Sequence, residues 1–330
     1  MARLQRNLAS YRATGADFVR GDPAAAHGAP FEGYFWRIVD ARNGAVVVAL
    51  SAVCLGPDGP WGLSTLAAHP GGFSRTVITP SARAEPAAFG VQAEGVLRGD
   101  AARVAVDMGP DAQLDVSLHD AIAWPRRPFG ALGLAHAVPS LPQYWHPVVL
   151  SAGVRGRVRA GDLSLDLGGA TAYAEKNWGH GFPARWWWGH AAAFGDDVSV
   201  SFAGGRVALL WHELAPTAVV VRLGRRVLAF APPAARTRAS VGEGGWRLRT
   251  RGRGYTVEIA GDAAGARPHD LLVPVPAEQR GELRSRQLLA GRLSLLVRRA
   301  GRVQYADESP LAGLELGVPL TQPPRGAPPG

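Results

Sequence analysis

The sequence predicts an all-β protein built from two antiparallel, barrel-like halves. Its 330 residues include 42 Gly and 26 Pro, which favours many turns and short strands over long helices. Apolar or alternating runs recur along the chain and are broken by Gly, Pro, Asp or Asn. No window keeps a 3.6-residue apolar period over three turns. These runs therefore indicate an antiparallel sandwich or barrel rather than βαβ units.

The first elements are expected to form a hairpin. Residues 31–39 (FEGYFWRIV) are rich in aromatic and β-branched side chains, which predicts a strand. An Asn-Gly pair follows at 43–44, and this pair between apolar runs is a strong hairpin signal. The return strand is expected at 45–55.

Short strands are expected along the rest of the chain. They are predicted at 76–79, 91–97, 103–108, 114–118, 154–158, 163–167, 187–194, 198–202, 207–210, 218–223, 227–230, 246–250, 255–259, 283–286, 293–298 and 314–316. A small barrel has about 8 strands, and the chain has more than twice as many predicted runs. The number of predicted strands therefore favours two barrels. The proline-rich segment 124–147 is typical of a crossover loop.

These patterns divide the chain into four parts. We expect an N-terminal arm at 1–27, a first barrel at 28–160, a second barrel at 161–320 and a disordered tail at 321–330.

Charge and composition restrict the classes of function. The formal net charge is +9, but the arginines are scattered, which indicates a solvated surface rather than a nucleic-acid site. The nine histidines lack metal-ligand spacing, so no metal is expected. Residues 1–23 lack an apolar signal region, and the longest apolar run is shorter than the ~20 residues that span a bilayer. We expect a cytoplasmic protein, with peripheral membrane contact left open.

One segment is chemically unlike the rest of the chain. Lys176, within 173–183 (YAEKNWGHGFP), is the only lysine, and every other basic residue is an arginine. Lysine shifts its pKa readily when buried, and arginine does not replace it in that role. Three consecutive tryptophans follow at 186–188. We interpret this segment as one wall of a site.

The faces of this segment separate its two charges. If 173–178 is a strand, Glu175 and Asn177 lie on one face, and Lys176 and Trp178 on the other. The charges then enter one lumen only if a bend turns both inward. The alternative is that Glu175 and Lys176 form a structural ion pair and the tryptophans are barrel packing.

Two further sets of side chains each share a strand face. They are Trp186, Trp188 and His190 after the lysine segment, and Glu32, Tyr34 and Trp36 on the opening strand. A carboxyl group between two aromatic rings is a candidate buried acid with a raised pKa. The alternative is that Glu32 lies at a solvated rim.

These motifs resemble the tocopherol cyclase family. The resemblance rests on 31–37 (FEGYFWR), on 173–179 (YAEKNWG) with the F-P-x-x-W-x-W continuation at 182–188, on 280–283, and on 307–317 (DESPLAGLELG). It extends over roughly residues 28–318. It implies two lipocalin-like β-barrel domains, related to carotenoid 1,2-hydratases, and the cyclisation of a prenylated hydroquinone to a chromanol.

The implied reaction protonates a prenyl double bond, and the phenol oxygen traps the tertiary cation. It needs an acid in a dry pocket, aromatic faces beside the cation and a group that orients the phenol. We expect Glu175 or Glu32 to be the acid and Lys176 to assist. The expected substrate-binding residues are Tyr34, Trp36, Asn177, Trp178, Trp186, Trp188 and His190. The expected partner is a hydrophobic isoprenoid or prenylquinol, and an isomerisation of this kind needs no cofactor.

Two other functions stay open. A hydratase adds water to the prenyl double bond in place of the phenol oxygen. A carrier binds an isoprenoid in a lipocalin-like barrel without turnover.

Overall fold

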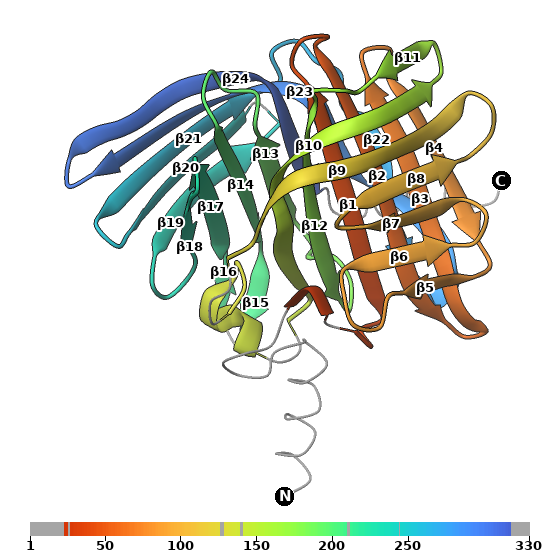
Figure 1. Cartoon of the computed structure of the whole chain (residues 1–330). Helices are drawn as coiled ribbons and strands as arrows, with labels where there is room; N and C mark the ends of the chain where they lie inside the picture. Colours follow the sequence, from red (N-terminus) through yellow and green to blue (C-terminus); the bar gives the residue numbers. More distant parts are fainter. Residues whose placement is uncertain are drawn as a thin grey trace, which may run out of the picture.

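The computed structural model describes residues 23–25, 27–125, 129–138, 141–209, 212–243 and 245–317. These residues form β-strands with three short 3₁₀ helices and no α-helix. Two antiparallel sheets curl toward closed barrels and stand side by side (Figure 1), so the predicted all-β fold with two barrels is confirmed. Among the described helices, none is long and apolar enough to cross a membrane. The predicted tail lies outside the described residues, as does most of the predicted arm.

The N-terminal sheet has twelve strands in the order β4-β3-β2-β1-β12-β10-β9-β8-β7-β6-β5, with β11 paired to β10. Strands β5 and β6 come back to contact β2 and β3, which nearly closes the barrel. The bounds are β1 Phe31–Asp40, β2 Ala45–Gly56, β3 Gly59–His69, β4 Phe73–Thr79, β5 Ala82–Ala84, β6 Gly90–Ala93, β7 Leu97–Asp100, β8 Arg103–Asp107, β9 Ala112–Ala123, β10 Gln143–Ala160, β11 Leu163–Asp166 and β12 Thr171–Gly179.

The C-terminal sheet has ten strands in the order β18-β17-β14-β13-β24-β23-β21-β20-β19, with β22 paired to β23. The bounds are β13 Trp186–Ala191, β14 Val198–Gly205, β17 Thr217–Leu223, β18 Arg226–Phe230, β19 Arg236–Gly242, β20 Gly245–Gly252, β21 Tyr255–Asp262, β22 His269–Val275, β23 Arg280–Arg299 and β24 Arg302–Gly317. A separate hairpin pairs β15 (Val207–Leu209) with β16 (His212–Leu214), and the 3₁₀ helices are η1 Pro23–Ala25, η2 Gly133–Ala137 and η3 Pro276–Glu278.

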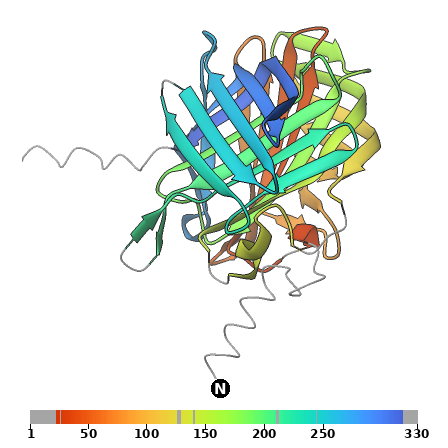
Figure 2. The same cartoon turned by 90° about the vertical axis from the view of Figure 1, so that its left-hand side faces the viewer.

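Apolar side chains form a core inside each barrel and a third core between the barrels. The third core takes Phe35 and Tyr173 from the N-terminal sheet and Trp188, Leu289 and Leu311 from the C-terminal sheet. Figure 2, viewed from the side of the C-terminal sheet, shows this sheet in front of the N-terminal one. The outer faces of β1 and β12 are therefore buried by a second barrel instead of facing water.

The chain passes from one sheet to the other later than the predicted division at 160 and 161. Strands β11 and β12 still pair with β10, and the C-terminal sheet starts at Trp186. The change of sheet therefore falls between Gly179 and Trp186. The division into domains stays a prediction, but the sheets do not divide at that point.

Several predicted elements differ from the structure. The predicted strand at 91–97 is split into β6 and β7 by a turn in which Gly95 has a φ of 69°. The predicted crossover loop at 124–147 overlaps β10, which begins at Gln143. Pro147 fits in that strand because the pairing of β10 with β12 shifts register between Pro147 and Val149.

Candidate active site

Strand alternation divides the predicted site residues between the two faces of β12. Strands β1 and β12 pair without a register shift, with Tyr34 opposite Lys176 and Phe35 opposite Glu175. The Lys176 face lies on the inner side of the N-terminal barrel, together with the core residue Ala174. The Glu175 face lies against the C-terminal sheet, together with Tyr173. The predicted separation of the two charges is confirmed, and no bend brings them together.

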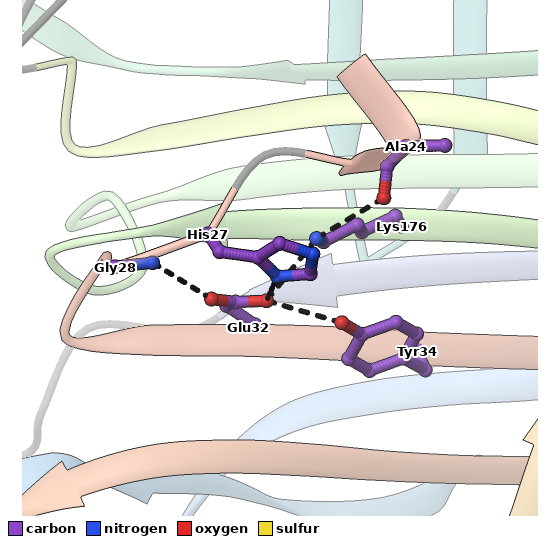
Figure 3. Close-up of polar contacts among 6 residues, drawn as sticks. All are labelled: Ala24, His27, Gly28, Glu32, Tyr34 and Lys176. Atoms are coloured by element: carbon purple, nitrogen blue, oxygen red, sulfur yellow. Dashed lines mark hydrogen bonds and ion pairs between the residues drawn. The ribbon is translucent and has the colours of Figure 1, made fainter. Parts of the chain in front are cut away.

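Glu32 and Lys176 form a buried ion pair on the inner face (Figure 3). Lys176 Nζ lies 3.1 Å from Glu32 Oε2, and the two side chains are 0% and 7% exposed. The same Oε2 atom lies 2.8 Å from His27 Nδ1 and accepts a 3.0 Å hydrogen bond from the Tyr34 hydroxyl. The backbone N–H of Gly28 donates to Oε1 at 3.0 Å. The solvated rim expected as the alternative for Glu32 is therefore wrong.

The charge of Glu32 follows from these contacts. Burial acts to raise the pKa of Glu32, but Lys176 and His27 act to lower it, and the net pKa is below the ordinary value. Glu32 is therefore held as a carboxylate rather than as a neutral acid. This contradicts the raised pKa predicted from its aromatic neighbours.

Lys176 is fixed from several sides. Its ammonium donates to the Ala24 carbonyl at 3.3 Å and lies 5.2 Å from the centre of the Tyr34 ring and 5.7 Å from that of Trp178. A compact ammonium can make these contacts together, whereas a guanidinium is larger and needs acceptors arranged to match its planar fork of N–H donors. The alternative of a Glu175–Lys176 ion pair is wrong, because the partner of Lys176 is Glu32.

Glu175 accepts three hydrogen bonds at a single oxygen. Tyr173 Oη, Trp145 Nε1 and Trp188 Nε1 lie 2.6, 2.7 and 2.8 Å from Glu175 Oε2. Within the described part of the chain, none of these donors reaches Oε1. Burial raises the pKa of Glu175 to about 7, although the three donors oppose the rise, and the carboxyl of Glu315 adds to it. Glu175 is thus a buried acid that holds its proton near neutral pH.

A histidine and an arginine complete the buried layer behind Glu175. The His190 ring stacks on Tyr173 with 4.1 Å between centroids. Arg37 lies 3.5 Å from His190 Nδ1 and donates to the carbonyls of Leu289 and Leu311 at 2.8 Å each. Burial lowers the pKa of His190 well below its ordinary value, and Arg37 adds to this effect. His190 is therefore neutral and packs against the Tyr173 ring, which does not fit a proton donor.

A cavity of ≈ 80 Å³ lies between the barrels beside Glu175. Its wall combines apolar residues from both sheets with a few polar groups. The apolar part includes Phe31, Phe35, Leu63, Trp188, Leu271 and Leu272, and the polar part includes Glu175, Asn177, Gln287 and Glu315. Strand β22 contributes Leu271 to Pro274 to this wall. The predicted residues Glu175, Asn177 and Trp188 meet here.

Glu315 is a second carboxyl group in this wall that sequence reasoning missed. Its Oε1 accepts hydrogen bonds from Trp186 Nε1 at 2.7 Å and from Ser285 Oγ at 2.9 Å. Burial raises its pKa above the ordinary value. Trp186, which was predicted to bind substrate, does not line the cavity and instead donates to Glu315, which does. The signal in the sequence was the Leu-Glu-Leu alternation at 314–316, which is equally typical of a solvent-facing glutamate.

The structure places Trp36 and Trp178 away from the cavity and Tyr34 at its edge. Trp36 belongs to the core of the N-terminal barrel, and its Nε1 donates to the Asp100 carbonyl at 3.0 Å. Trp178 stacks on Tyr144 with 5.5 Å between centroids. Tyr34 borders the cavity, but its hydroxyl bonds Glu32. Among the described residues, no group of three or more His, Cys, Asp or Glu side chains is arranged to hold a metal ion.

The fold and the site define an all-β protein with two barrels and a buried acid in the cavity between them. A family model described as tocopherol cyclase-like matches residues 88–318. The chain belongs to the tocopherol cyclase-like family.

Individual relatives are distant. A chloroplastic tocopherol cyclase from Zea mays is 23% identical over 180 residues, which cover 52% of this chain and 38% of that protein. A probable chloroplastic tocopherol cyclase from Oryza sativa subsp. japonica is 24% identical over 133 residues, covering 38% of this chain and 28% of that protein. The chain thus matches less than half of the length of these relatives.

Two solved structures share the fold. Kievitone hydratase from Nectria haematococca superposes with a TM-score of 0.52 and 11% identity, covering 88% of this chain and 89% of that one. CghA in complex with Sch210972 superposes with a TM-score of 0.55 and 13% identity, covering 89% and 90%. At these identities the likeness concerns the fold alone.

Proposed function

We propose that the protein is a cofactor-free cyclase that converts a prenylated hydroquinone, or a related isoprenoid, into a chromanol. The main support for this proposal is Glu175, because it is a buried acid with a pKa of about 7 that borders an apolar cavity. Family membership supports the reaction class, and the apolar wall supports a hydrophobic substrate.

Glu175 donates the first proton. A proton on Oε1 passes to the less substituted carbon of the prenyl double bond, which leaves a tertiary cation. The negative charge that develops on Glu175 is stabilised by the three donors already aimed at Oε2. The Trp188 ring in the cavity wall offers a face to the cation.

Glu315 receives the second proton. The phenol oxygen attacks the cation and forms the new C–O bond, and its proton moves to the Glu315 carboxylate. Two nearby carboxyl groups in an apolar site share one proton most readily, because a second charge is unfavourable. Return of the proton from Glu315 to Glu175 resets the site. The substrate and the product therefore have equal mass.

Two acceptors in the wall are suited to hold the phenol hydroxyl. Asn177 Oδ1 and Gln287 Oε1 are buried and have no hydrogen-bond partner among the described residues. A hydroxyl group in the cavity would satisfy either one. Gly33 is needed beside Asn177, because a Cβ at Gly33 would lie 2.2 Å from Asn177 Oδ1.

Hydration of the double bond is the second candidate. The cavity of ≈ 80 Å³ has room for water beside Glu175, and the same two acceptors suit a water molecule. Water would then attack the cation in place of the phenol.

Product mass tests the proposal. The purified protein is incubated with a prenylated hydroquinone, and the products are separated by liquid chromatography with mass spectrometry. A cyclase gives a product of unchanged mass, and a hydratase gives a product heavier by one water. Saturable binding of the hydroquinone with neither product would instead indicate a carrier and reject the enzyme.

A further inference from the structure

The outer face of the C-terminal sheet carries arginines that lie directly opposite one another. Arg236 on β19 pairs with Arg251 on β20, and Arg238 pairs with Arg249. All four side chains are exposed. Like charges directly opposite on neighbouring strands are destabilising. Because these opposed arginines lower the stability of the sheet, we look for a binding role that would account for them.

Positive charge is also present at the tips of the two neighbouring hairpins, β20–β21 and β23–β24. The register places Tyr255 opposite Arg299 and Thr256 opposite Arg298, so the β20–β21 and β23–β24 turns are neighbours. Both hairpins end at the left edge of the molecule in Figure 1. We call the whole set the arginine face: Arg236, Arg238, Arg249, Arg251, Arg253, Arg298, Arg299 and Arg302. Glu258 lies within this face and pairs with Arg249 at 3.2 Å.

The N-terminal sheet shows that an arginine-rich composition alone does not produce such a face. There, Arg157 lies opposite Asp115 on β9 and Asp166 on β11. Arg103 donates to Asp115 at 2.9 Å, and Arg75 bonds both oxygens of Asp111. These arginines of the N-terminal sheet lie opposite carboxylates, whereas on β19 and β20 of the C-terminal sheet two pairs of arginines lie opposite each other.

We infer that the arginine face docks the protein on an anionic phospholipid surface. Guanidinium groups bind phosphate through paired N–H donors. Arg238, Arg247 and Arg249 line a shallow groove together with the apolar side chain of Leu296, which suits a headgroup above an acyl chain. The carboxylates of Glu258 and Asp307 also line this groove, so its three arginines exceed its two acidic residues. Val303, next to Arg302 at the hairpin tip, is 51% exposed and can enter the apolar boundary of a bilayer.

Single-stranded nucleic acid fits this face less well. Such sites combine basic grooves with aromatic rings on which bases stack. The residues of the arginine face and its groove include no aromatic side chain, and Tyr255 at the edge lies beneath Arg299, 5.6 Å from the ring centre. The inference goes beyond the proposed function, because docking requires no turnover.

Vesicle binding tests the inference. The full chain is sedimented with vesicles of phosphatidylglycerol and phosphatidylcholine, and with vesicles of phosphatidylcholine alone. The test variant carries R236Q, R238Q, R249Q and R251Q. The control carries R98Q, R155Q, R157Q and R159Q, which remove the same charge from exposed positions of the N-terminal sheet. Thermal unfolding of both variants checks their folding.

The wild type is expected to bind only the anionic vesicles, and less as salt increases. The partition coefficient should fall roughly tenfold or more in the test variant and by less than about twofold in the control. Equal losses in both variants, or no binding by the wild type, would overturn the inference. So would displacement from the vesicles by a single-stranded oligonucleotide at comparable concentration. None of these results depends on turnover. The vesicle experiment can therefore fail while the proposed cyclase activity is confirmed, or succeed while that activity is rejected.

Discussion

Glu175 and Glu32 show how neighbouring groups decide the chemistry of a buried carboxyl. Both side chains are nearly inaccessible, at 3% and 5% residue exposure. Glu32 has a cation at 3.1 Å and keeps its charge. Glu175 has only neutral donors and keeps its proton to about pH 7. The two carboxyl groups that were equal candidates from the sequence therefore have different roles.

Lys176 is expected to be a structural residue. Removing one partner of a buried ion pair leaves an unpaired charge, so K176M and E32Q should each lower the free energy of unfolding by roughly 3–5 kcal/mol. The double variant should lose less than the sum of the two, because it leaves no isolated charge. Denaturant unfolding of the four proteins measures this coupling. The exposed pair Arg103–Asp115 provides the control, with an expected coupling of about 1 kcal/mol or less.

Strictly additive losses at Lys176 and Glu32 would contradict the ion pair. Loss of turnover in K176M with unchanged stability would restore the catalytic role that the sequence suggested for this lysine.

The sequence predicted part of the site at this scale. Alternation along 173–178 correctly separated Glu175 from Lys176, since this depends only on the period of a strand. It did not predict that Lys176 pairs with Glu32 or that Trp145 donates to Glu175. These contacts join strands far apart in the chain, and local periodicity carries no information about them. Glu315 was missed because a second barrel covers a face that local sequence presents as solvent-exposed.

At the scale of elements, strand β22 is expected to control access to the cavity. It pairs with β23 alone, and its pairing shifts register between Leu271 and Leu272, both of which border the cavity. A pocket for a drug-sized ligand usually holds roughly 300–1,000 Å³. The cavity of ≈ 80 Å³ must therefore widen before a prenylated hydroquinone enters. Among the strands of the cavity wall, β22 has the fewest paired neighbours, so moving it breaks the fewest backbone hydrogen bonds.

Hydrogen exchange is expected to locate this movement. In the free protein, amides of 269–275 should exchange faster than those of 171–179, because β12 is paired on both edges. Adding a prenylated hydroquinone to the E175Q variant should slow exchange in 269–275 and leave 171–179 unchanged. Equal protection of both segments before and after addition would show that β22 is not the moving wall.

Element prediction succeeded where the pattern is local. The opening hairpin at 31–39 and 45–55 was found because its turn and both strands are strong signals. Strand β3 was missed, since its run of small and polar residues resembles a loop and gains its burial from neighbouring strands. Strand β23 was predicted as two short pieces, 283–286 and 293–298, which lie on either side of Gly291. The structure keeps one strand by shifting the register with β24 on both sides of this glycine.

At the scale of the whole molecule, the site belongs to neither barrel lumen. Each lumen contains an apolar core, to which the N-terminal barrel adds the Glu32–Lys176 ion pair. The acid cavity lies where the outer faces of the two sheets meet. Pockets often occur at such contacts between packed units. The number of strands predicted two barrels, but their packing could not be deduced. It depends on which outer faces are complementary, and this is a property of the assembled surfaces.

The central claim is that Glu175, buried between the barrels, protonates the substrate. The rate of chromanol formation is measured from pH 5 to pH 9 for the wild type, for E175Q and for the exposed control E94Q. The protonated form of Glu175 is active, so the wild-type rate should fall as the pH rises through about 7. Below pH 7, E175Q should be at least roughly 100-fold slower than the wild type while remaining folded, and its rate should not fall through pH 7. E94Q should match the wild type. An E175Q variant that keeps the wild-type rate and pH profile would contradict the claim.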